Sequence, residues 1–194
     1  MFAKSEHKYL RQFVIKFLAV FFILYYGTLA VIGLTIKGGY YSQYIHDHLD
    51  YITWLRRCIL RSSGIVCNIL GYATHIENTY ILRASSGEGV RMVYSCIGFG
   101  IMSFWIAFIS ANKGPMKTKS IWILSGILII FIINVLRVSL LLVSVITDHR
   151  LPFNLDHHSI FNLIAYLLIF FMVYIYDKRS KITHSGNYQN LMIN

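Results

Sequence analysis

The sequence has few acidic residues and few cysteines. Asp and Glu number 8 against 18 Lys and Arg in 194 residues, which gives a formal net charge of +10. Cys58, Cys67 and Cys96 are an odd number without metal-ligand spacing, so neither a disulfide framework nor a zinc finger is indicated. Charged residues make up 13% of the chain and hydrophobic residues 56%, far from the composition of a soluble domain. The sequence therefore predicts a membrane protein.

Four apolar runs indicate the architecture. A bilayer core about 30 Å thick is crossed by roughly 20 apolar helical residues. The runs predict an all-α integral membrane bundle, a single domain over 1–194, with spans at about 13–34, 94–111, 120–147 and 158–177. The second is short, because its apolar part, 96–111, reaches only about 24 Å as a helix, so it spans only if one end lies at the interface.

Basic residues cluster before the first span, between the second and third, and after the fourth. Short cytoplasmic loops are enriched in Lys and Arg, and four crossings place all three clusters on one side. Segment 37–93 is then extracytoplasmic, in a multi-pass protein of the inner cell membrane. Since the orientation rule accounts for the positive charge, the lipid bilayer is expected as a partner and nucleic acid is not.

Segment 51–72 is apolar but contains Arg56, Arg57 and Arg61. Each arginine costs about 2.5–3.5 kcal/mol at the centre of a spanning helix, and one more crossing would invert every later loop. The segment is therefore predicted as an extracytoplasmic amphipathic or re-entrant helix. After it, two β-type runs around the turn residues 85–89 predict a short β-hairpin that leads into Cys96.

Three residues whose side chains could take part in chemistry fall at the outer ends of the last three spans: Cys96, Arg137 and His158. Helical spacing gives each its own polar or small-residue stripe: Cys96, Gly100, Ser103, Ala107 and Ser110; Asn134, Arg137, Ser144 and Asp148; His158, Asn162 and Ala165. Cysteine and histidine are often ordinary packing or interfacial residues. An arginine inside a span is costly enough to indicate a functional site or an ion pair, with Asp148 or Asp156 as candidate partners.

The stretches "SCIGFG" around Cys96, "NVLRVSLLL" around Arg137 and "HHSIFNLIAY" around His158 resemble the signature blocks of the exosortase and archaeosortase family of multi-pass membrane transpeptidases. The resemblance covers roughly 90–166. Cys-Ile-Gly stands where the family usually has Cys-Ser-Gly, and Asn162 where a small residue is common. Both departures bear on the substrate subclass.

The resemblance implies a catalytic Cys96, Arg137 and His158 triad at the extracytoplasmic face, with the adjacent His157 as the alternative histidine. It also implies a cysteine protease or transpeptidase activity on exported proteins that carry a C-terminal sorting signal, which consists of a short motif, a transmembrane helix and a basic tail. No cofactor or metal is expected for this function.

Two other functions stay open. A metal-binding membrane protein would use outer imidazoles and carboxylates, which suit zinc: His46, Asp47, His48, Asp50, Asp148, His149, Asp156, His157 and His158. A non-enzymatic membrane scaffold would instead pair Arg137 with an acidic residue and use Cys96 only for packing.

Overall fold

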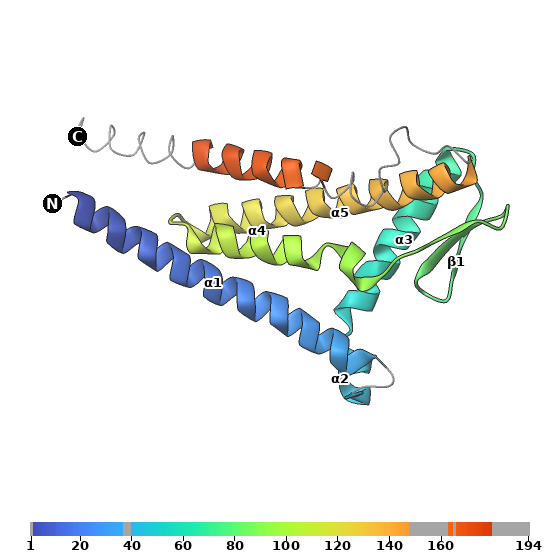
Figure 1. Ribbon diagram of the computed structural model, residues 1–194, viewed down its shortest axis with the longest axis horizontal. Helices are drawn as coiled ribbons and strands as arrows, with labels where there is room; N and C mark the ends of the chain where they lie inside the picture. The colour runs from blue at the N-terminus through green and yellow to red at the C-terminus, as the bar shows by residue number, and fades with distance from the viewer. Residues whose placement is uncertain (1, 37–39, 148–162, 165, 180–194) are drawn as a thin grey trace.

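The computed structural model describes residues 2–36, 40–147, 163–164 and 166–179 (Figure 1). The chain runs through α1 (Phe2–Thr35), α2 (Gln43–Leu49), α3 (Tyr51–Ile69), β1 (Thr74–Glu77), β2 (Ile81–Ala84), β3 (Gly89–Arg91), the 3₁₀ turn η1 (Tyr94–Ile97), α4 (Phe99–Ala111) and α5 (Met116–Ile146). Residues 163–164 and 166–179 are also helical. The prediction of a mainly helical chain is confirmed.

Within these residues, two helices are long and apolar enough to cross a membrane: α1 over His7–Thr35, and α5 over its whole length. They contain the predicted spans 13–34 and, but for Thr147, 120–147. The prediction for 94–111 was too long, because α4 has 13 residues and begins at Phe99. The fourth predicted span, 158–177, begins outside the described residues. Residues 166–177 of it are described and are helical.

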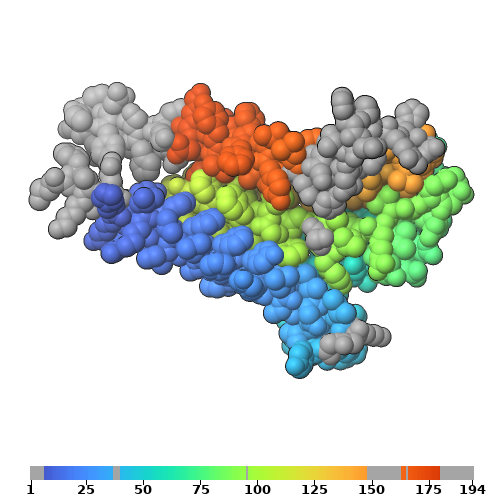
Figure 2. All heavy atoms as spheres, in the orientation of Figure 1, coloured from blue at the N-terminus to red at the C-terminus, as the bar shows by residue number. Residues whose placement is uncertain are grey.

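Aromatic side chains join α1 to α4 in an antiparallel pair. Phe13 lies edge-on to Phe108 with ring centroids 6.0 Å apart, and at the other end Tyr25 lies 5.5 Å from Phe99. Between these contacts, Phe17 meets Phe104 at 5.5 Å. The α1 residues are separated by four and eight positions, so they lie along one face of that helix. Figure 2 shows the result, with α4 lying between α1 and the C-terminal helical residues.

The contact of α4 with α5 depends on a glycine. Trp105 is fully buried and its indole Nε1 donates to the carbonyl oxygen of Trp122 at 2.9 Å. A Cβ on Gly126 would overlap that indole. The absence of a side chain at Gly126 thus lets the largest buried side chain of α4 fit against α5.

The predicted hairpin is present and has a third strand. β2 and β3 pair antiparallel across the turn, with Leu82 opposite Val90. β1 adds to the other edge of β2 with Ile76 opposite Leu82, which gives the order β1-β2-β3. The predicted helix in 51–72 is also present as α3, which contacts both the sheet and α5. The sheet and α3 together cover one end of α5 (Figure 1).

The opposite end of the molecule carries the basic clusters. The start of α1, the turn between α4 and α5, and the end of the C-terminal helical residues all lie there (Figure 1). Lys113 of the turn lies over the ring of Tyr9 of α1, 4.3 Å from its centroid. Tyr176 lies edge-on to Trp122 at 5.4 Å. The grouping of the three clusters that the sequence predicted is therefore a feature of the fold.

Candidate functional site

Cys96 lies in the 3₁₀ turn η1, just before α4. Its backbone N–H donates to the carbonyl of Val93 at 3.0 Å, and the turn ends at Gly98, whose φ is +82°. The stripe that treated Cys96, Gly100 and Ser103 as one helical face is therefore wrong at its first member. A left-handed residue interrupts the helix, so Cys96 does not share the geometry of α4.

The interruption at Gly98 is held by α5. The side-chain Nδ2 of Asn134 donates to the carbonyl oxygen of Ile97 at 2.8 Å, and Asn134 is buried. A Cβ at position 98 would lie 2.8 Å from that same nitrogen. Glycine is required here both for its backbone angle and for the close approach of the amide. This hydrogen bond fastens the turn that carries Cys96 to α5.

Arg137 follows Asn134 by three residues and so lies on the same side of α5. Its Nη2 donates to the Sγ of Cys96 at 3.6 Å, within the longer range of hydrogen bonds to sulfur. Both side chains are half-buried. The structure thus brings together two of the three predicted site residues, which come from different elements and lie 41 positions apart in sequence.

The third predicted site residue lies outside the described residues. This applies to His158 and to its alternative His157, and equally to Asp148 and Asp156, the acidic residues considered as ion-pair partners of Arg137. Sequence reasoning for these positions stays a prediction.

A polar seam between α3 and α5, which the sequence analysis missed, fixes α5 beside the site. Ser63 Oγ donates to the carbonyl of Val135 at 3.1 Å, and Ser139 Oγ lies within hydrogen-bond distance of the carbonyl of Ser63 at 3.3 Å. Both serines are essentially fully buried. Small residues at Ser63, Gly64 and Cys67 on one side of α3 were the available sign of a close helix contact.

Cys67 belongs to this seam and differs chemically from Cys96. Its side chain is fully buried, and its Sγ lies 3.8 Å from the carbonyl oxygen of Ser139. Burial raises the pKa of the Cys67 thiol, and the contact with Ser139 opposes that rise only in part. A buried thiol of this kind is a poor nucleophile.

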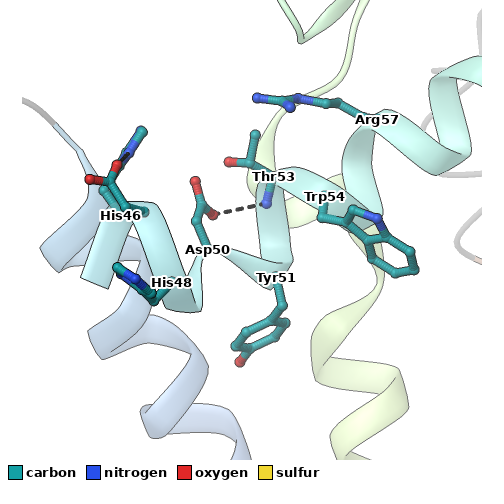
Figure 3. Close-up of a pocket in the computed structure, with 8 residues that line it drawn as sticks. His46, His48, Asp50, Tyr51, Thr53, Trp54 and Arg57 are labelled. Carbon is teal, nitrogen blue, oxygen red and sulfur yellow. Dashed lines mark hydrogen bonds and ion pairs between the residues drawn. The ribbon is translucent and has the colours of Figure 1, made fainter. Parts of the chain in front are cut away.

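The described part of the outer histidine and carboxylate group does not form a metal centre. Figure 3 shows that the side chains of His46, His48 and Asp50 point in different directions. His46 Nδ1 lies 3.1 Å from Asp47 Oδ1, and this hydrogen bond is the main cause of a lowered pKa of the Asp47 carboxyl. Among the described residues, no three His, Cys, Asp or Glu side chains are placed to share a metal ion.

Asp50 has a structural task instead. Its Oδ1 accepts from the backbone N–H of Thr53 at 3.0 Å, which caps the first turn of α3. The dashed line in Figure 3 marks this bond.

Comparison with known proteins adds no assignment. No protein-family model matches the sequence, and neither the curated proteins nor the solved structures give a match.

Proposed function

We propose that the chain is a membrane-embedded cysteine peptidase or transpeptidase of the exosortase and archaeosortase kind. It processes the C-terminal sorting signals of exported proteins. The observation that carries the proposal is the contact between Arg137 Nη2 and Cys96 Sγ at 3.6 Å. A cationic group beside a thiol is the environment in which cysteine acts as a nucleophile.

The place of this pair in the fold supports the proposal. The turn η1, which carries Cys96, contacts α3, and α3 and the sheet lie at the end of the molecule opposite the basic clusters (Figure 1). If the clusters face the cytoplasm as the orientation rule expects, the thiol works near the outer surface of the inner membrane. A substrate anchored by its own C-terminal helix would present its sorting motif at that level.

The proposed reaction has two steps. The Cys96 thiol gives its proton to an imidazole, assigned to His158, and the sulfur attacks the scissile carbonyl carbon. The peptide C–N bond breaks, the leaving amine takes the proton from the imidazole, and the acyl group remains on Cys96 as a thioester. An amine on an acceptor, or water, then attacks the thioester and releases the thiol.

Arg137 has a separate role in this scheme. A guanidinium keeps its positive charge in proteins and presents several N–H donors in a fixed plane. In the first step the carbonyl oxygen of the substrate gains negative charge close to Sγ. The Arg137 guanidinium already contacts Sγ, so this oxygen is within its reach. Arg137 therefore stabilises the oxyanion, and donors aimed at developing charge are usually a large part of catalysis.

Trapping of the acyl-enzyme tests the proposal. The full-length chain is co-expressed with an exported protein that ends in a short motif, a transmembrane helix and a basic tail, and intact-mass analysis looks for a substrate adduct. We expect the adduct on Cys96, its absence from Cys96→Ala, and its persistence in Cys58→Ala, the matched control at another thiol. Normal processing in Cys96→Ala would overturn the proposal.

The same assay separates the rival functions. A thiol enzyme loses activity to an alkylating reagent and keeps it in EDTA, whereas a metal-dependent protein shows the reverse. A scaffold would yield no adduct under any condition and would tolerate loss of the Cys96 thiol.

A further inference from the structure

A polar cleft, separate from the Cys96 and Arg137 pair, lies between the end of α1, the first turns of α3 and the sheet. Its volume is about 590 Å³. Three arginines line it, Arg56 and Arg57 from α3 and Arg91 from β3, together with the carboxylate of Asp50 and the imidazole of His46. Among the described residues that line the cleft, Asp50 is the one acidic side chain, so positive charge dominates this lining.

Arg56 is the central feature of the cleft. Its side chain is only 7% exposed, and among the described residues no acceptor satisfies its Nε. The guanidinium lies over the ring of Tyr94, 4.7 Å from its centroid, which offsets part of the cost of burying a charge. An unmet N–H on a buried cation is expensive all the same, and the guanidinium that carries it lines the cleft.

Arg91 adds a second cation at the same place. Its guanidinium lies 5.1 Å from the centroid of the Tyr80 ring, and that of Arg56 lies 5.8 Å from the centroid of the same ring. Two like charges around one aromatic ring repel each other, and an anion bound between them would offset this repulsion. Asp50 supplies one negative charge, with its Oδ1 capping α3 through Thr53, so the three guanidiniums of the cleft keep a net positive charge.

We propose that this cleft binds a phosphate group. Guanidinium groups match phosphate oxygens by paired hydrogen bonds, and three guanidiniums offset by one carboxylate suit an anion that carries close to two negative charges. Inorganic phosphate leaves most of the volume empty, so the cleft also accommodates what the phosphate is attached to.

The phosphate has two possible sources, a lipid head group and a phosphate free in solution. The cleft is also lined by Thr35 and Ile36, at the end of the apolar helix α1, which places it where the surface of a bilayer would be. The proposal uses neither Cys96 nor Arg137 and stands independently of the proposed peptidase activity.

The test is a binding titration on the purified full-length chain in dodecyl maltoside. The probes are inorganic phosphate, dihexanoyl phosphatidic acid, dihexanoylglycerol as the lipid without phosphate, and acetate as a carboxylate. We expect saturable binding of at least one phosphate probe. Binding of phosphatidic acid alone identifies a lipid source, binding of inorganic phosphate a soluble source, and both are compatible with the proposal.

Three arginine variants locate the binding. Arg56→Gln and Arg91→Gln should each weaken binding about ten-fold or more, the usual loss for one charge-assisted hydrogen bond. Arg61→Gln is the matched control, since Arg61 is an exposed arginine of α3 outside the cleft lining. Arg91 is exposed on a strand, so its variant keeps the test valid if Arg56→Gln fails to fold.

Three results would overturn the proposal. They are no saturable binding of either phosphate probe, equal loss in Arg61→Gln, and acetate or dihexanoylglycerol binding as tightly as the phosphate probes.

Discussion

Arg137 donates a hydrogen bond from Nη2 to the Sγ of Cys96, over 3.6 Å. The arginine belongs to α5, an apolar helix of 31 residues, and the cysteine to a short 3₁₀ turn. A permanent cation within such a helix is costly, and its contact with a thiol is the relationship on which the proposed chemistry depends.

Replacement of Cys96 by Ala should leave the protein in the membrane and abolish substrate processing. The thiol is the proposed nucleophile, and loss of a nucleophile lowers turnover by about a thousand-fold or more. The fraction of processed substrate on an immunoblot measures this effect, with Cys58→Ala as control. Processing by Cys96→Ala at the normal rate would exclude the role.

Replacement of Arg137 by Lys should be nearly as harmful as replacement by Ala. Lysine keeps the charge but lacks the planar set of donors that reaches Sγ and the oxyanion together. Initial processing rates should fall about 10²–10³-fold, the usual loss for an oxyanion donor. Full activity in Arg137→Lys would mean that a simple positive charge suffices.

Replacement of Gly98 by Ala should destabilise the protein and disturb the site. The position needs a φ of +82°, and the new Cβ would lie 2.8 Å from Asn134 Nδ2. Strain of this kind costs about 1–3 kcal/mol, seen as a lower Tm in detergent. Gly27→Ala is the control, because nothing lies within 4 Å of a Cβ there. An unchanged Tm in Gly98→Ala would contradict the described turn.

Cys67 should react with N-ethylmaleimide more slowly than Cys58. It is fully buried, and burial raises its pKa above the ordinary value of 9.0, so little thiolate forms near neutral pH. Because the folded-state pKa is the higher one, the contribution of this thiol to stability is complete below pH 9.0 and is lost as the pH rises through that pKa. Peptide mapping by mass spectrometry compares the two rates, and faster labelling of Cys67 would disprove its burial.

The sequence predicted those parts of the fold that follow from local chemistry. The turn residues around Gly87 marked the hairpin, and the apolar runs marked α1 and α5. Strand β1 was missed because it is only four residues long, although Thr74 and Ile76 alternate with the polar His75 and Glu77. The break at Gly98 was missed because the apolar run continues through it, and its cause is a side chain of α5 that no local pattern reveals.

For the site, the cost of a charge in an apolar helix was enough to single out Arg137. The common outer level of Cys96 and Arg137 predicted that the two residues could meet, and they are in contact, although the helical geometry assumed for Cys96 was wrong. The small residues of α3 were a sign of a close helix contact, but the sequence did not identify its partner, because Ser63 and Ser139 are joined only when two distant helices meet.

The interruption of the helix at Gly98 affects how Cys96 moves. A cysteine continuous with α4 would move whenever that helix tilts to suit a thicker or thinner bilayer. Here the hydrogen bond from Asn134 to Ile97 attaches the turn that carries the thiol to α5, the same helix that carries the guanidinium. The two groups therefore move together, and the distance between them does not depend on the thickness of the bilayer.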